Sequence, residues 1–236
     1  MPAFGQDYFR INHFSFVNKL LSPPFSVGKS QISIFVIWLV TFSGMIGIWL
    51  GHGDWFLPKT PFNLMLGAGL LYWNFPMKNG WRSIMIWTLV YLMGMGTEIV
   101  GVNTGLLFGN YRYGENLGLK LFGVPLLIGI NWVVLTFLTA TICKRFIEHK
   151  WLALICGAAL MVALDFFIEP IAPIFDFWHW EAGYAPQKNY VDWFLVSLLM
   201  QVLVNKDLPE EKHPLPIYHF ASQVLFFAFF YVLYTF

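Results

Sequence analysis

Long runs of apolar residues, separated by short polar segments, constrain this chain more than any other feature. Of its 236 residues, 58% are hydrophobic and only 11% are charged, whereas an ordinary soluble domain carries about 25% charged residues. Several runs approach or exceed the length of about 18 residues at which an apolar stretch becomes a candidate transmembrane helix. The sequence therefore predicts an all-α fold, a polytopic integral membrane bundle of helices.

Seven apolar stretches are candidates for these helices. The second is the weakest, because it is short and contains Asn63 and Asn74. With all seven, ten of the 14 Lys and Arg residues fall on one side of the membrane and four on the other; without the second, the division is eight and six. Since basic residues gather on the cytoplasmic side, we expect seven spans, with the amino terminus cytoplasmic. The predicted spans are 32–51, 62–77, 82–101, 125–144, 151–171, 190–205 and 215–236.

Three regions outside the spans are distinctive. Residues 1–31 interleave aromatic and basic side chains, a composition suited to lipid headgroups, and we expect an interfacial arm there. Residues 32–236 then form a single transmembrane domain. The connections 102–124 and 172–189 are long and rich in Gly, Tyr, Trp and Phe. Both fall on the non-cytoplasmic side in the seven-span arrangement, so we expect them to lie together at one membrane face.

Glu98 stands near the end of the third predicted span. A charged side chain at bilayer depth is costly unless it is paired, protonated or facing a cavity, so an acid there is a candidate functional residue. The glycines that follow it, in 101–109, allow turns and close approach of the backbone. The alternative is an acid at the water interface that merely ends a helix.

Asp165 and Glu169 are four residues apart in the fifth predicted span, which places them on one helix face. Two acids so close in a low dielectric cannot both ionise cheaply, so we expect one to hold a proton and serve as a donor. The alternative is a structural, hydrogen-bonded pair. The aromatic loop 175–184 follows them; it is either an interfacial belt or a lining that stabilises a cation.

Several classes of protein are excluded by missing residues. A retinal-binding protein needs a lysine in its last span, and 215–236 contains none. A prenyltransferase that uses diphosphates needs two aspartate-rich clusters, and this chain has only one weakly similar segment, the two acids in 165–169. No GxGxxG, P-loop, GxSxG or HExxH motif occurs. The net charge of +1 indicates no nucleic-acid partner.

Two blocks of residues carry a resemblance to a known family. The first comprises 97–105, 108–113, 117–118, 123–125 and 131–132, and the second comprises 164–165, 169–170, 178, 180, 183–184, 186, 189–190 and 193–194. Together they resemble the membrane carotenoid hydratases, which include bisanhydrobacterioruberin hydratases of archaea and γ-carotene 1',2'-hydratases of bacteria. The resemblance runs from about residue 35 to residue 235. The chain departs from the family at Glu169, where Asp is usual, and at Asp192, where Gly is usual.

The resemblance implies an enzyme that adds water across the terminal 1,2 (1',2') double bond of a carotenoid ψ end. Protonation of the secondary alkene carbon gives a tertiary carbocation, which water captures as a tertiary alcohol. This chemistry needs an acid, an aromatic lining and a positioned water, but neither a cofactor nor a metal. We expect Glu98, Asp165 and Glu169 to be catalytic, with Asp165 or Glu98 as the proton donor. The residues expected to bind substrate or water are Asn103, Thr104, Tyr111, Tyr113, Asn131, Trp132, Trp178, Trp180, Tyr184, Asn189 and Trp193.

The same resemblance sets the expected surroundings and the alternatives. The partners are a lipid-soluble carotenoid and the bacterial cytoplasmic membrane, and contact with other carotenoid-pathway enzymes is open. A monocyclic substrate such as γ-carotene is preferred, because the near-neutral charge does not suit a halophilic archaeal source. Two alternatives remain: a carotenoid cyclase, which also begins by protonating an alkene, and a carotenoid-binding protein without turnover.

Overall fold

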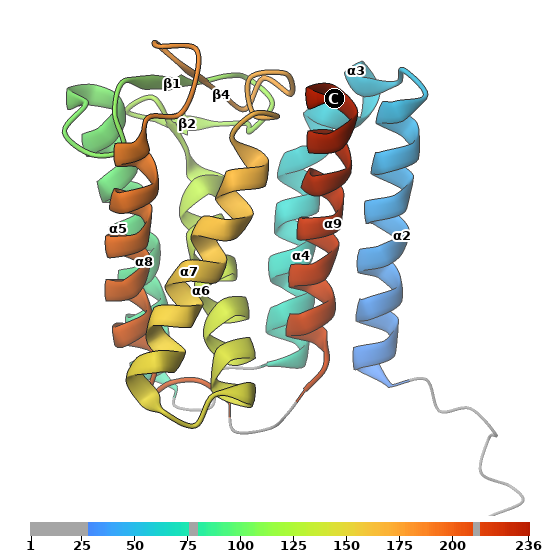
Figure 1. Cartoon of the computed structure of the whole chain (residues 1–236). Helices are drawn as coiled ribbons and strands as arrows, with labels where there is room; N and C mark the ends of the chain where they lie inside the picture. Colours follow the sequence, from blue (N-terminus) through green and yellow to red (C-terminus); the bar gives the residue numbers. More distant parts are fainter. Residues whose placement is uncertain (1–27, 76–79, 210–212) are drawn as a thin grey trace, which may run out of the picture.

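The computed structural model describes residues 28–75, 80–209 and 213–236, which form a bundle of helices capped at one end by short strands (Figure 1). Residues 1–27, most of the predicted interfacial arm, lie outside the described residues. The long helices are α2 (Lys29–Trp49), α4 (Thr60–Asn74), α5 (Trp81–Thr104), α6 (Leu126–Phe146), α7 (Lys150–Ile168), α8 (Gln187–Val204) and α9 (Leu215–Thr235). A short helix, α3 (Gly53–Phe56), and a 3-10 turn, η1 (Leu57–Lys59), connect α2 to α4.

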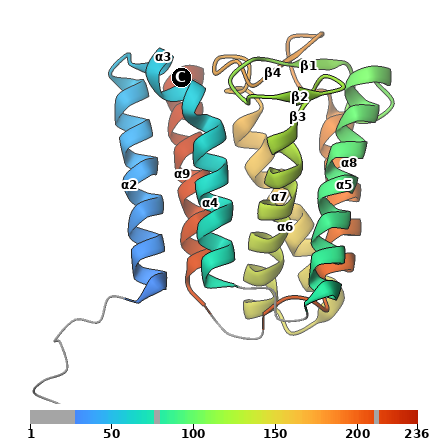
Figure 2. The same ribbon diagram turned by 180° about the vertical axis from the view of Figure 1, so that it is seen from behind.

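The seven long helices of the described chain match the seven predicted spans in order and alternate in direction (Figures 1 and 2). Five of them, α2, α5, α6, α7 and α9, are long and apolar enough to cross a membrane. Helix α4 has 15 residues, about 22 Å at 1.5 Å per residue, and is shorter than a typical hydrocarbon core. Helix α8 has 18 residues, among them Asn189, Asp192 and Gln201, which lower its hydropathy. The chain is therefore a helical membrane protein, with five helices that meet both criteria.

Helix α6 is the centre of the bundle. It packs against α4, α5, α7, α8 and α9, and 61% of its most apolar window is buried, against 17–44% for the other four candidate spans. Small residues allow this close packing. A Cβ at Gly94 of α5 would lie 2.7 Å from the Trp132 side chain of α6. The absence of a side chain at Gly94 therefore lets the fully buried Trp132 reach the interior next to Glu98.

The cap is built from two antiparallel strand pairs in the long connections. Strand β1 (Tyr111–Tyr113) pairs with β4 (Trp178–Trp180), and β2 (Lys120–Leu121) pairs with β3 (Val124–Pro125). The two long connections thus lie at the same end of the bundle, as we expected (Figure 1). The fold is mostly helical, as we expected, and these strands are a short addition to it. The strands are two or three residues long, too short for an alternating pattern, and β1 and β4 meet only because the helices bring distant loops together.

Asp176 links the two halves of the cap. One carboxylate oxygen accepts the Glu115 backbone N–H at 2.8 Å, and the other lies 2.8 Å from His179 Nε2. The residue has a φ of 52°, a conformation that Asp and Asn tolerate better than most side chains. The Glu115 N–H, followed by His179, holds the pKa of Asp176 below its usual value. The carboxylate therefore stabilises the folded cap in its ionised form.

This link predicts a stability that depends on pH. Because the pKa of Asp176 is lowered on folding, its stabilisation is complete above the unfolded value of about 3.9 and is lost as pH falls through the folded value. We expect Asp176→Asn to lower the thermal unfolding midpoint at pH 7, with the deficit shrinking toward pH 3. Glu181→Gln, which removes an exposed carboxyl of the same loop, is the control. A deficit that is constant over this pH range would contradict the assignment.

Candidate active site

Three buried carboxylic acids lie on one small cavity beneath the cap. Glu98 belongs to the last two turns of α5, Asp165 to the last turn of α7, and Glu169 directly follows α7. They are only 2%, 2% and 5% exposed. The cavity that they line has a volume of about 30 Å³. The acids therefore converge, as we expected, while their roles stay a prediction. The other lining residues are Phe108, Tyr111, Tyr113, Ile128, Asn131, Ile168, Trp178, Trp180, Asn189 and Trp193.

Glu98 accepts three hydrogen bonds. The Tyr111 and Tyr113 hydroxyls donate to Oε2 at 2.5 and 2.7 Å, and Trp132 Nε1 donates to Oε1 at 3.1 Å. Burial first, and then the nearby Glu98 carboxyl, raise the pKa of both tyrosines, so their hydroxyls stay protonated donors. Donors of this kind stabilise the ionised form of a carboxyl group. Glu98 is thus held as a hydrogen-bond acceptor on the cavity wall.

Asp165 and Glu169 are joined by one amide. Asn189 Nδ2 of α8 donates to Asp165 Oδ2 and to Glu169 Oε1, each at 2.9 Å. Glu169 Oε2 also accepts Trp180 Nε1 at 2.5 Å and Trp178 Nε1 at 3.1 Å. Within the described residues, the Asp165 carboxyl group therefore accepts one hydrogen bond, and the carboxyl groups of Glu98 and Glu169 accept three each. Of the three carboxyl groups, Asp165 has the least support for a negative charge.

The strand pair β1–β4 supplies four of these donors. Tyr111 and Tyr113 alternate with Arg112 in β1, and Trp178 and Trp180 alternate with His179 in β4. Successive side chains of a strand point to opposite faces, so the four aromatic donors face the acids. The register pairs Tyr111 with Trp180 and Tyr113 with Trp178. One short sheet therefore covers both Glu98 and Glu169.

Aromatic rings form the remaining walls. Trp193 of α8 stacks on Trp132, with ring centroids 4.0 Å apart, and Tyr111 lies 4.9 Å from Trp180. Phe108 has a φ of 64°, and its backbone N–H donates to Asp192 at 2.7 Å. Asp192 also contacts Lys188. Asp192, which stands where the family usually has Gly, thus connects the turn at Phe108 to α8.

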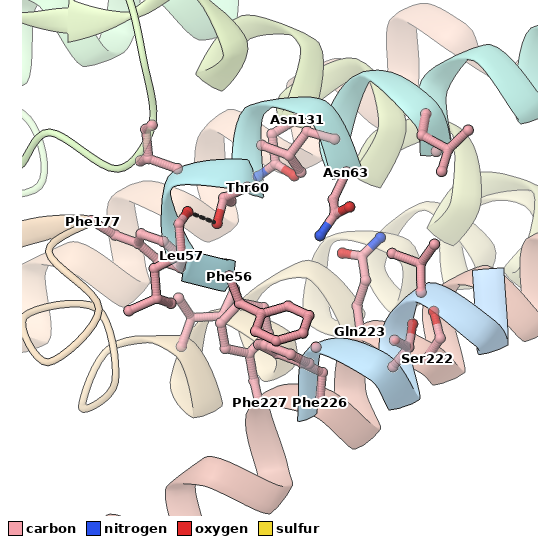
Figure 3. Close-up of a pocket in the computed structure, with 18 of the residues that line it drawn as sticks. Phe56, Leu57, Thr60, Asn63, Asn131, Phe177, Ser222, Gln223, Phe226 and Phe227 are labelled. Atoms are coloured by element: carbon pink, nitrogen blue, oxygen red, sulfur yellow. Dashed lines mark hydrogen bonds between the residues drawn. The ribbon is translucent and has the colours of Figure 1, made fainter. Parts of the chain in front are cut away.

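A second, larger cavity adjoins the first. It has a volume of about 190 Å³ and lies between α2, α4, α6 and α9 (Figure 3). Ile128, Asn131, Ile168 and Trp178 line both cavities. We did not predict this cavity from the sequence. The sequence feature that could have indicated it is a set of polar residues within apolar helices. Asn63 is one of them, and we had used it only as a reason to rate the second span as the weakest candidate.

Three predicted binding residues line neither of the two cavities. The Asn103 side chain donates to the carbonyls of Ile99 and Phe122, at 2.8 and 3.0 Å. The Thr104 hydroxyl donates to its own helix at Val100. Both are exposed, because the last turn of α5 directs them away from the cavity. Tyr184 is 70% exposed on the β4–α8 loop. Trp132 contacts Glu98 but is not one of the residues that line the cavity.

Two comparisons relate the chain to known proteins. Over residues 60–236, the chain matches the family model described as "Carotenoid biosynthesis protein". It is 28% identical over 117 residues to a bisanhydrobacterioruberin hydratase of Haloarcula japonica, a match that covers 44% of this chain and 38% of the relative. The chain thus spans well under half of the length of that relative. No solved structure matches the chain. Because the family model covers about three quarters of its length, the chain belongs to the carotenoid biosynthesis protein family.

Proposed function

We propose that this protein adds water to the terminal double bond of a carotenoid ψ end. The observation that carries the proposal is that two cavities of different character lie next to each other. A small one holds three buried carboxyl groups, and a larger, mostly apolar one shares four residues with it. Water and acid occupy the first, and the hydrocarbon end of the substrate reaches them from the second. A substrate dissolved in the bilayer suits a bundle with five apolar helices.

Asp165 is the proposed proton donor. It is buried and accepts a single hydrogen bond from Asn189, so its neutral form is favoured over a carboxylate. Its proton moves to the secondary carbon of the alkene, and the π electrons of the double bond form the new C–H bond. The positive charge that develops at the tertiary carbon is stabilised by the carboxylate of Glu98 and by the aromatic faces around the cavity.

Water capture completes the proposed reaction. A cavity of about 30 Å³ has room for about two water molecules, because each needs roughly 10–15 Å³ by this measure. One water adds its oxygen to the tertiary carbon, and its surplus proton passes to a carboxylate and returns to Asp165. Asn131 lies on the wall common to both cavities, and its side chain bonds to no other described residue, so we assign it the positioning of this water.

The room for water favours hydration over the two alternatives. A cyclase quenches the cation with an internal double bond and needs no water beside it. A binding protein needs no acids. The substrate is a monocyclic or acyclic carotenoid with a free ψ end, γ-carotene being preferred. The predicted orientation, with the amino terminus cytoplasmic, places the cap on the outer side of a bacterial cytoplasmic membrane.

Expression in a host that makes lycopene or γ-carotene tests the function directly. We expect the pigment to gain the mass of one water at each ψ end that reacts, and to carry a tertiary alcohol. An isomer of unchanged mass would identify a cyclase. Unchanged pigment that copurifies with the protein would identify a binding protein. An empty-vector culture and the Asp165→Asn variant serve as controls for host enzymes.

A further inference from the structure

The larger cavity contains polar groups that the proposed reaction does not use. Asn63 of α4 and Gln223 of α9 extend toward each other across it (Figure 3), and Thr41 of α2 also lines it. None of these three side chains has a hydrogen bond to another described residue. In contrast, the Thr60 hydroxyl donates to the Leu57 carbonyl at 2.7 Å, and the Ser222 hydroxyl donates to the His219 carbonyl at 2.8 Å.

Unpaired amides are unusual within an apolar bundle. A polar group that faces hydrocarbon without a partner is costly, so helices in membranes place such groups where a partner or a cavity satisfies them. Asn63 is exposed and Gln223 is half-buried, so both are accessible to a ligand. The two amides come from different helices and face each other across the cavity. The arrangement therefore indicates a ligand with its own hydrogen-bonding group.

The lining also defines the kind of ligand. None of the residues around this cavity is charged, so it offers nothing to neutralise a phosphate or a carboxylate. Most of its wall is apolar, with Phe56, Phe226 and Phe227 among the lining residues. An amide presents one acceptor and two donors, which match a hydroxyl that both donates and accepts. A neutral, largely hydrocarbon molecule with a hydroxyl group fits these requirements.

We propose that Asn63 and Gln223, with Thr41, form a subsite for the hydroxyl of the hydrated carotenoid. This inference rests on the proposed function, because that reaction creates a tertiary alcohol in the adjoining cavity. The two cavities share Asn131 and Trp178 in their walls, so the end of the chain has only a short way to move from one to the other. Acid-catalysed hydration is reversible, and an alcohol left beside Asp165 can lose water again. The amide subsite holds the alcohol away from the acids.

Binding measurements on the full-length protein in detergent test the subsite. The probes are the tertiary alcohol, prepared chemically, and the alkene from which it derives; quenching of tryptophan fluorescence by the polyene reports binding. We expect the wild type to bind the alcohol roughly tenfold more tightly than the alkene, the value of about one net hydrogen bond. Equal affinity of the wild type for the two probes would overturn the inference, whatever the behaviour of any variant.

Two variants test whether the amides of Asn63 and Gln223 cause the preference for the alcohol over the alkene. Asn63→Leu and Gln223→Met keep the approximate shape of each side chain and remove its hydrogen bonds; we expect each to bring the two affinities together. Asn205→Leu, at the end of α8 opposite the cap, is the matched control and should keep the preference. Folding is checked by circular dichroism. A preference that persists in folded Asn63→Leu and Gln223→Met would overturn the assignment.

An isotope-exchange experiment, taken with the binding measurements, separates this inference from the proposed function. In water enriched in oxygen-18, the alcohol exchanges its oxygen only when it ionises again at the acids. We expect the two amide variants to exchange several-fold more label per turnover than the wild type, and an unchanged ratio would count against the subsite. A wild type that hydrates no substrate but prefers the alcohol would refute the proposed function and leave the subsite standing.

Discussion

Replacing Asp165 with asparagine is expected to lower the rate of hydration at least about a hundredfold, the usual contribution of a general acid. Asparagine has nearly the same shape as aspartate but carries no acidic proton. The Asp165 carboxyl is 2% exposed, so bulk water cannot replace the lost donor. The substrate should still bind, because the larger cavity is unchanged. The measurement is the initial rate of alcohol formation, with bound pigment determined in parallel.

Comparison with the other acids distinguishes the roles. Glu98→Gln and Glu169→Gln should also slow the reaction, since each removes negative charge from the cavity. Glu115→Gln is the matched control: its side chain is 85% exposed and pairs with Lys120 on the cap. A solvent deuterium isotope effect well above one is expected if protonation limits the rate. Full activity of Asp165→Asn, in a folded protein, would refute the donor assignment.

The second large effect should follow from Asn131→Leu, which separates protonation from hydration. If Asn131 positions the water, the cation still forms in the variant but is captured at least tenfold less often. It then loses a proton and returns to an alkene. In deuterated water we expect the recovered carotenoid to carry deuterium at its ψ end while the yield of alcohol falls. Mass spectrometry of the recovered pigment measures both quantities in one sample.

The control for this variant is again Asn205→Leu, which makes the same change at the far end of α8 and should leave hydration unaffected. Leucine keeps the branched shape of asparagine but replaces its amide oxygen and nitrogen with larger methyl groups, so bound pigment is measured in parallel to show that the substrate still enters. Parallel losses of deuterium incorporation and of alcohol would show that Asn131 acts before the cation forms. That outcome would remove the water-positioning role while leaving the donor role of Asp165 intact.

The helical membrane architecture and the acids could be predicted from the sequence, because both depend on local information. Hydropathy and the charge bias of the loops predicted the order of the long helices. The four-residue spacing of Asp165 and Glu169 placed them on one helix face, and Asn189 bridges them there. The alternation of aromatic residues in 111–113 and 178–180 was visible, but its meaning as two pairs of donors was not.

The tertiary structure alone decided which residues meet. Glu98 lies on the same cavity as Asp165 and Glu169 because Gly94 allows Trp132 to pack closely and because β1 pairs with β4. Asn103 and Thr104 are close to Glu98 in sequence, yet the helix turns them outward, where backbone carbonyls satisfy them. The amides of the larger cavity come from helices that are distant in the chain. Such contacts depend on side-chain direction and on the packing of several helices at once, which no local pattern encodes.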